Sequence, residues 1–284
     1  MNTHPISTGQ PNVLRKLLRH RSATIGASII LFFFIIAIFA PQIATHKPKT
    51  TDVENRLIVW SGEHLLGTDG AGRDIFSRVL YGSRISLKVG FIAMTFSLGF
   101  GTLFGAIAGY YGGWLDNSIM RFMDMLLAMP SILLAMVIVT ILGQSLTNAI
   151  IAVSIVYIPQ YARILRASVL KVRELDYVTS AKVIGASDGR ILVTTVLPNC
   201  IAPLIVQATL GIGAAILDAA GLSFLGLGAE IGVPEWGAML NENTKFIHKA
   251  PLAVTAPGVA IFLVVLGFNL LGDALRDALD PQLD

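Results

Sequence analysis

The sequence has few charged residues, and this shortage argues against an ordinary soluble protein. Only 14% of its 284 residues are Asp, Glu, Lys or Arg, whereas a soluble domain typically has about 25%. Hydrophobic residues make up 54% of the chain. A polytopic membrane protein is therefore the expected class, and the usual estimate of domain number from length does not apply.

Motifs for covalent, metal or nucleotide chemistry are also absent from the sequence. Cys200 is the single cysteine, so no disulfide can form within the chain. We find no His or Cys spacing for a metal, no Gly-x-x-x-x-Gly-Lys-[Ser/Thr] phosphate loop, and no His-Glu-x-x-His or Gly-x-Ser-x-Gly motif. We therefore expect no enzyme activity, no bound metal and no bound cofactor in this chain.

The basic residues do not point to nucleic acid either. The net charge is +3, and the Lys and Arg residues are scattered through loops instead of forming a patch with aromatic residues. A nucleic-acid-binding surface requires such a patch. We interpret these residues as signals of membrane topology.

Long apolar runs are present, and they predict six transmembrane helices. A spanning helix needs about 20 mostly apolar residues. The first run, after a basic flank at Arg15, Lys16, Arg19 and Arg21, is longer than the core of a signal peptide, which has roughly 7–15 residues. We interpret it as an uncleaved anchor, with a signal peptide as the alternative. The predicted spans are 23–40, 86–111, 124–142, 147–161, 199–221 and 252–271.

The distribution of Lys and Arg predicts the orientation of these spans. Six spans place both termini on one side, and the basic N-terminal tail and 162–196 segment make that side cytoplasmic. The 41–81 loop is also basic, but a long folded loop can cross the membrane despite its charge. The predicted organisation is a cytoplasmic tail 1–22, an anchor helix 23–40, an extracytoplasmic loop 41–85, a five-helix core 86–271 with a cytoplasmic loop 171–198, and a cytoplasmic tail 272–284.

Two features inside the predicted spans suggest specific roles. Gly101, Gly105 and Gly109 recur every four residues, which predicts a small-residue stripe for close helix packing, or alternatively the lining of a moving gate. Asp218 lies among apolar residues, and ionisable groups in a span usually face a cavity or a partner. A translocation-path role and a structural role both remain open for Asp218. Near the cytoplasmic surface, Arg121 and Asp124 predict a local ion pair.

The polar stretch 176–187, between two apolar ones, predicts a rigid cytoplasmic elbow. Gly185 is suited to end a short helix, and Ser187 or Asp188 to cap the next one. Small side chains on the first helix suit insertion into a groove of another protein, although packing on its own bundle is the alternative. The candidate coupling residues are Asp176, Tyr177, Thr179, Ser180, Ala181, Ile184, Gly185, Ala186, Leu197 and Pro198.

This elbow resembles the EAA coupling loop of ABC importer permeases. The family pattern is Glu-Ala-Ala, three residues, Gly, nine residues, then Ile-x-Leu-Pro. Alignment on Gly185 places Thr179–Ser180–Ala181 at the Glu-Ala-Ala positions and Leu197-Pro198 at the expected distance. Thr179, Ser180 and Thr195 depart from the pattern. The missing carboxylate at Thr179 removes any specific salt bridge from that position, but the small size of the segment is kept.

Other stretches are similar to the C-type permeases of dipeptide and oligopeptide importers, and the resemblance covers nearly the whole chain. They are Leu66-Gly67-Thr68-Asp69 with Gly72-Arg73-Asp74, 81–87, 222–228, Glu235-Trp236-Gly237 and 272–281. The resemblance implies an all-α, type I ABC importer permease fold in the bacterial cytoplasmic (inner) membrane.

The same resemblance implies an assembly of several chains. The expected partners are a second homologous permease, two ABC ATPases that bind ATP and Mg, an extracytoplasmic binding protein, a peptide substrate and membrane lipid. Two alternatives remain. One is an ion- or proton-coupled secondary transporter, and the other is the same ABC machinery carrying nickel complexes or glutathione.

Overall fold

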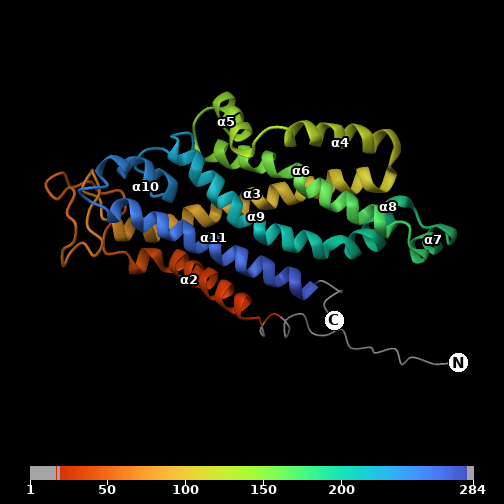
Figure 1. The fold of residues 1–284 in the computed structure, drawn as a ribbon, viewed down its shortest axis with the longest axis horizontal. Coiled ribbons are helices and arrows are strands. Elements are labelled where there is room, and N and C mark those ends of the chain that lie inside the picture. Colours follow the sequence, from red (N-terminus) through yellow and green to blue (C-terminus); the bar gives the residue numbers. More distant parts are fainter. Residues whose placement is uncertain (1–16, 18–19, 280–284) are drawn as a thin grey trace.

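The computed structural model describes residues 17 and 20–279, and these form helices and loops without a strand. Arg15, Lys16, Arg19 and the Asp280-Pro281 ending of the last motif lie outside the described residues. The helices are α2 (Arg21–Ile43), α3 (Ile75–Tyr111), α4 (Gly113–Leu127), α5 (Ser131–Leu142), α6 (Leu146–Val172), α7 (Asp176–Val183), α8 (Asp188–Ile191), α9 (Ile201–Phe224), α10 (Trp236–Asn243) and α11 (Leu252–Leu279), as Figure 1 shows.

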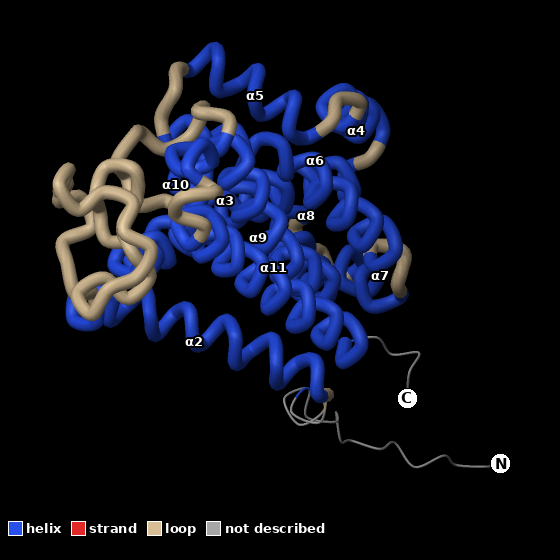
Figure 2. The backbone as a smooth tube through the Cα atoms, turned by 60° about the vertical axis from the view of Figure 1, so that its left-hand side comes forward, coloured by secondary structure: helices blue, strands red, loops and turns tan. Residues whose placement is uncertain are grey.

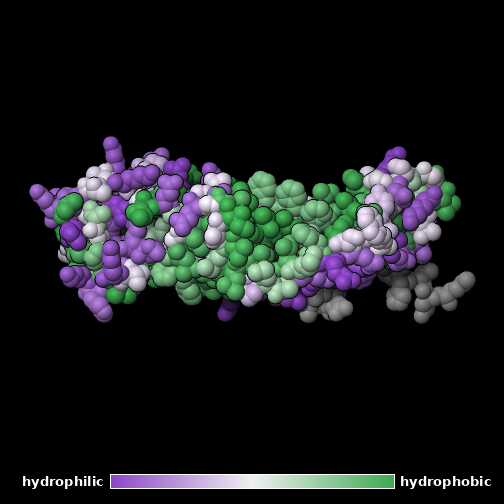
Figure 3. Space-filling view, turned by 90° about the horizontal axis from the view of Figure 1, so that it is seen from above, coloured by the Kyte–Doolittle hydropathy of each residue, from purple (hydrophilic) through white to green (hydrophobic). Residues whose placement is uncertain are grey.

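Five helical segments in the described residues are long and apolar enough to cross a membrane: α2, α3, α6, the run 188–224 that ends in α9, and α11. A sixth span is counted if α4 and α5 are taken together. Figure 3 shows hydrophobic surface across the middle of one face of the molecule, with hydrophilic surface gathered at the two ends. This pattern confirms the predicted all-α membrane fold.

The third predicted span, 124–142, contains a sharp bend. The segment is broken between α4 and α5, and the two helices meet at 94°. Pro130 lies directly before α5 with an extended ψ of 134°. A proline lacks the N–H needed to continue the helix, and it disfavours a helical conformation in the residue before it. The sequence therefore contains enough apolar residues for a span, but the backbone turns within it.

Ion pairs hold α4 along α6. Arg166 Nη2 donates to Asp116 Oδ2 at 2.6 Å, and Arg163 Nη2 lies 2.6 Å from Asp124 Oδ1. The predicted local pair of Asp124 with Arg121 is therefore replaced by a pair with another helix. The two charges are neighbours in space although 39 residues separate them in the chain.

Several helices extend beyond the predicted spans. The second begins at Ile75, not at residue 86, because the Asp74 side chain accepts a hydrogen bond from the Ser77 N–H and caps it. The first continues through Pro41 to Ile43, and the last runs to Leu279. Part of each predicted flanking loop or tail is therefore helical, because polar residues continue a helix beyond its apolar length.

The described residues form two large apolar cores and a small third cluster of Ile75, Ala250 and Ala253. One large core joins α3, α5, α6 and α9, and the other joins α2, α3, α9, α10 and α11. The anchor helix α2 is part of this bundle, because Gly26 lies so close to α11 that an added Cβ would be 2.7 Å from the Gly267 carbonyl oxygen. Figure 2 shows the long helices side by side, with a cluster of loops at one end.

The three glycines of the predicted stripe lie against α6. An added Cβ would be 2.4 Å from Tyr161 Cβ at Gly101, 2.4 Å from the Ala162 carbonyl oxygen at Gly105, and 2.9 Å from Val169 Cβ at Gly109. The absence of side chains therefore permits α3 and α6 to approach at backbone distance, which increases van der Waals contact between them.

Replacing Gly105 with alanine should destabilise the bundle by about 1–3 kcal/mol, because the new methyl group overpacks a contact with backbone. Gly99→Ala is a matched control on the same helix, since an added Cβ there meets nothing within 4 Å. We expect Gly99→Ala to be neutral or slightly stabilising. Thermal unfolding of the two variants in detergent measures the difference, and equal midpoints would contradict this packing.

Candidate functional site

The candidate site is the elbow between α6 and α9, where a helix-stop motif reverses the chain. The Gly185 N–H donates to the Lys182 carbonyl at 2.9 Å, and the Ala186 N–H donates to the Ala181 carbonyl at 3.1 Å. Gly185 has φ = +87°. This pair of hydrogen bonds with a left-handed residue is a Schellman motif, which ends a helix in a fixed direction. The elbow is thus a defined shape and not a loose loop.

The cap predicted for the second short helix was only half right. Ser187 is the N-cap residue of α8 by backbone conformation, but its side chain makes no capping hydrogen bond. The Asp188 carboxylate instead accepts a hydrogen bond from the Tyr110 hydroxyl, at 2.9 Å. The acidic side chain therefore fastens the elbow to the end of α3 instead of satisfying the first turn of its own helix.

The tip of the elbow exposes apolar side chains. Ile184 is 85% exposed and Val183 is 82% exposed, while Val178 is fully buried beneath them. Thr179 and Ser180 are exposed on α7, and the Ser180 hydroxyl donates to the Asp176 carbonyl of its own helix. Exposed large aliphatic residues on a rigid projection are a typical feature of a contact surface for another protein.

Three contacts fix the base of the elbow on the bundle. The Tyr110 hydroxyl donates to Asp188, and the Lys182 ammonium lies 5.7 Å from the centre of the Tyr110 ring. Arg173 Nη1 donates to the Gly109 carbonyl at 2.7 Å and to the Tyr110 carbonyl at 3.3 Å. The elbow is therefore bonded to α3, in addition to its chain connections to α6 and α9. Sequence reasoning missed Tyr110 and Arg173, which carry no local motif.

The return to the membrane at Leu197-Pro198 keeps a helical path. Residues 192–196 form a π-helical stretch, 197–200 form a 3₁₀ turn that contains Pro198, and α9 follows at Ile201. Pro198 therefore lies at a change of hydrogen-bonding pattern within one 188–224 run. Proline is accommodated there because a change from π to 3₁₀ bonding does not need its missing N–H.

Asp218 is bound to a neighbouring helix in the described structure. The Tyr157 hydroxyl of α6 donates to Asp218 Oδ2 at 2.9 Å, which joins α6 and α9. Asp218 is partly buried. The pairing partner comes from a position 61 residues away, so no local sequence signal would have identified it. The interhelical bond is the contact seen, and a role in the translocation path remains a prediction.

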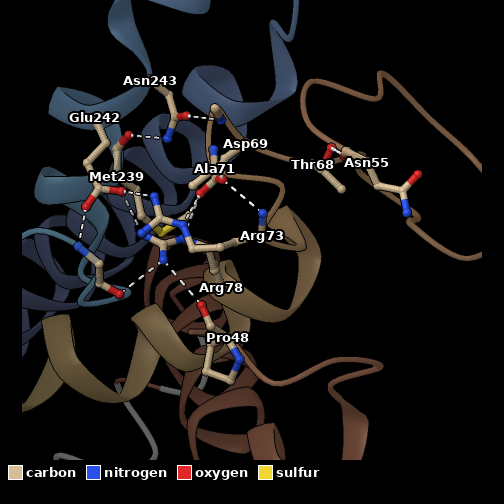
Figure 4. Close-up of polar contacts among 12 residues, drawn as sticks. Pro48, Asn55, Thr68, Asp69, Ala71, Arg73, Arg78, Met239, Glu242 and Asn243 are labelled. Carbon is tan, nitrogen blue, oxygen red and sulfur yellow. Dashed lines mark hydrogen bonds and ion pairs between the residues drawn. The ribbon is translucent and has the colours of Figure 1, made fainter. Parts of the chain in front are cut away.

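At the opposite end of the molecule, two arginines bind two carboxylates. Arg73 Nε donates to Asp69 Oδ2 at 2.7 Å, and Arg78 Nη2 lies 3.0 Å from Glu242 Oε2, which Arg73 also contacts. Figure 4 shows both guanidinium groups between these carboxylates. Arg78 is completely buried. The motif residues Asp69 and Arg73 thus connect the 44–74 loop to α10.

Backbone carbonyls complete the surroundings of Arg78. Its Nη1 atom donates to the Gly232 carbonyl at 3.1 Å and to the Pro48 carbonyl at 3.3 Å. Asn243 contributes a further link between the two segments, because its Oδ1 accepts from the Gly70 N–H at 3.2 Å. This network is a structural fastening of the loops around buried charges.

The Glu235-Trp236-Gly237 motif begins α10 at the same end. Glu235 is buried and accepts hydrogen bonds from the Gly237 and Ala238 N–H groups at 3.0 and 2.8 Å. Burial raises the pKa of the Glu235 carboxyl, and these backbone donors oppose the shift. Trp236 is fully buried, and its Nε1 donates to the Val79 carbonyl of α3. The motif therefore anchors α10 on the start of α3.

Comparison with known protein families identifies this architecture. Residues 101–284 match the model of the binding-protein-dependent transport system inner membrane component. The chain belongs to this permease family. Residues 12–59 also match the N-terminal transmembrane domain of oligopeptide transport permease C. The permease is thus a non-enzymatic, multi-pass component of a bacterial inner-membrane ABC importer, which is what the resemblance in its motifs implied.

Close relatives of this permease have two kinds of names. It is 53% identical over 269 residues to the dipeptide transport system permease protein DppC of Alkalihalophilus pseudofirmus, covering 95% of this chain and 88% of that one. DppC of Haemophilus influenzae is 49% identical, with 93% and 92% covered. The glutathione transport system permease protein GsiD of Pectobacterium atrosepticum is 44% identical, with 95% and 90% covered.

A solved structure shares the fold of the permease. An inward-facing conformation of the MetNI methionine ABC transporter superposes with a TM-score of 0.59 at 17% identity, covering 72% of this chain and 98% of that one. This confirms the predicted type I ABC importer permease fold.

Proposed function

We propose that this permease carries dipeptides or short peptides inward, and that the α7–Gly185–α8 elbow receives the work of ATP hydrolysis from a separate ATPase. The feature that carries this proposal is the exposed apolar tip at Val183 and Ile184 on a projection fixed by a Schellman motif. Exposure of these apolar side chains to water is unfavourable, and insertion into an apolar groove of a partner would remove their surface from water.

The mechanical argument depends on the contacts at the base of the elbow. Because Asp188 is bonded to Tyr110 and Arg173 to the end of α3, a push on α7 reaches three long helices at once. Packed helices have a few discrete arrangements and do not deform continuously. Closure of an ATPase pair would therefore switch the bundle between two states. ATP and Mg belong to those ATPases, since this chain has no phosphate loop.

The remaining assembly follows the same proposal. A second homologous permease completes the pathway, two ABC ATPases dock on the side of the elbow, and an extracytoplasmic binding protein delivers the peptide on the opposite side. The names of the relatives support a peptide substrate, because dipeptides and glutathione both have peptide bonds and free charged termini. We also propose that Asp218 lies beside the pathway, where an acidic group suits the ammonium group of a peptide.

An uptake assay tests this proposal. Proteoliposomes that contain the complete transporter should accumulate a labelled dipeptide only when ATP and the binding protein are present. Uptake that persists without ATP but collapses with an ionophore would instead support an ion-coupled carrier. Unlabelled glutathione in excess distinguishes the two substrate classes, since a dipeptide system should lose little uptake to it.

Replacing Ile184 with aspartate tests the docking surface directly. If Ile184 inserts into an ATPase groove, its loss removes about 1.5–3 kcal/mol of burial, so the ATPase that copurifies with the permease should fall by about tenfold or more. Ile231→Asp is the matched control, since Ile231 is 91% exposed but lies beside Arg73 and Glu242 of the buried arginine network, and not on the elbow. Unchanged copurification of the ATPase with Ile184→Asp would contradict the proposed contact.

A further inference from the structure

Three side chains with metal-binding atoms converge beside the start of α3, outside the elbow and the buried arginine network. A ring nitrogen of His46, a ring nitrogen of His64 and an oxygen of Asp74 all lie within 4.8 Å of one another. His64 Nδ1 is 2.9 Å from Asp74 Oδ1, and His46 Nδ1 is 3.9 Å from the same oxygen. The two imidazole rings are stacked with centres 4.6 Å apart.

We propose that His46, His64 and Asp74 form a binding site for a first-row divalent cation of the zinc class. Two imidazoles and one carboxylate are a ligand set that zinc uses in open sites, where water fills the fourth position. The softer copper and nickel ions also accept imidazole ligands.

The distances fit such an ion with small adjustments. Zinc bonds to nitrogen and oxygen are about 2.0–2.2 Å long, so two ligand atoms of a tetrahedral site lie about 3.4 Å apart. The two measured separations from Asp74 Oδ1 lie on either side of this value. The ion would bind at the Nδ1 edges of the two rings, replace the direct contact of His64 with Asp74, and draw His46 inward.

The carboxylate and both histidines are held in place by other contacts. The two carboxylate oxygens of Asp74 have different partners. Oδ2 accepts a hydrogen bond from the Ser77 N–H at 2.8 Å, and Oδ1 faces the imidazole of His64. The His64 N–H donates to Ser61 Oγ at 3.0 Å, and the His46 N–H donates to Ser77 Oγ at 3.0 Å. These two bonds come from backbone N–H groups, and they hold the chain at both histidines against neighbouring side chains.

The site is open to solvent on one side only. The Asp74 side chain is 1% exposed and that of His64 is 11% exposed, while that of His46 is 40% exposed. An ion can therefore approach past His46 and bind against a buried carboxylate. Bound there, it would join the 44–64 part of the outer loop to the first turn of α3, at the end opposite the elbow.

Sequence reasoning missed this site because positions 46, 64 and 74 fall outside the short spacings of metal motifs. Only the folding of the loop back onto α3 brings them together. The site uses no residue of the elbow, so it stands independently of the proposed function.

Zinc binding by the full chain tests the inference. The permease is purified in detergent without a polyhistidine tag, stripped with a chelator and titrated with Zn²⁺ against a chromophoric competitor. We expect one tightly bound ion per chain and an unfolding midpoint that rises with Zn²⁺. Cobalt substitution should produce the intense visible absorption of a tetrahedral site. Absence of a stoichiometric ion would overturn the proposal.

Two variants separate a built site from general histidine binding. His46→Ala removes a partly exposed ligand without opening the core, so the apoprotein should unfold as the wild type does, while the Kd for Zn²⁺ rises by about tenfold or more. His248→Ala, at an exposed histidine, should leave the Kd unchanged. Equal zinc affinity in His46→Ala and wild type, or loss of binding in His248→Ala, would refute the site.

Discussion

Replacing Gly185 with proline should reduce ATP-dependent uptake by an order of magnitude or more while the permease still inserts into the membrane. Gly185 has φ = +87°, and proline is locked near −65°. The change also removes the N–H that donates to the Lys182 carbonyl. A proline in such an incompatible position costs about 3 kcal/mol or more, and every factor of ten in an equilibrium constant corresponds to about 1.4 kcal/mol. The elbow would therefore leave its coupling geometry.

Two further variants separate backbone geometry from side-chain loss in this experiment. An added Cβ meets nothing within 4 Å at either Gly185 or Gly189. Gly185→Ala therefore adds only the strain of a left-handed alanine, about 1–2 kcal/mol, and should have an intermediate effect. Gly189→Ala changes a residue within the short helix α8, and this variant should transport normally. Wild-type uptake by Gly185→Pro in the proteoliposome assay would show that the elbow does not couple ATP hydrolysis to transport.

Replacing Arg78 with methionine should cause the largest loss of stability, about 3–5 kcal/mol, because it leaves two buried carboxylates with only the Arg73 guanidinium to pair them. Arg78 is fully buried. Its Nε lies 3.5 Å from Asp69 Oδ2, and its Nη2 lies 3.0 Å from Glu242 Oε2. Its loss also frees the Gly232 and Pro48 carbonyls. The midpoint of thermal unfolding in detergent measures this change.

The control for Arg78→Met is Arg84→Met, which changes an exposed arginine on the same helix. It should shift the unfolding midpoint little. Adding Glu242→Gln to Arg78→Met should restore part of the lost stability, because the neutral amide no longer leaves an unpaired negative charge. Equal midpoints for the Arg78 and Arg84 variants would show that the contacts of Arg78 with Asp69 and Glu242 do not stabilise the outer loops.

The helices and the helix stop could be read from the sequence because their signals are local. Apolar runs located all the spans approximately, and Gly185 marked the turn of the elbow, since a helix that reverses there requires a left-handed residue. The glycine stripe had a recognisable period along α3, and the structure places those glycines against α6. Hydrophobic length did not reveal the break at Pro130, because composition measures how many residues are apolar and not the direction of the backbone.

The contacts around the candidate site were harder to predict from the sequence, because they join distant parts of the chain. Tyr110 bonds Asp188 across 78 residues, and Tyr157 bonds Asp218 across 61. Neither tyrosine lies in a motif. A side chain that bonds to a residue on another helix produces no sequence pattern in its own segment. Its partner is therefore known only from the packed structure.

Composition and apolar run length by themselves determined a membrane protein, and the helix-stop glycine determined a rigid elbow, because insertion into lipid and helix termination depend on residues close together in the chain. The resemblance of its motifs to a known family implied a permease. Tertiary packing alone decided the partner of Asp218, the burial of Arg78 and the meeting of His46 with His64 and Asp74. These outcomes depend on distances between segments, and loop closure and helix crossing set those distances.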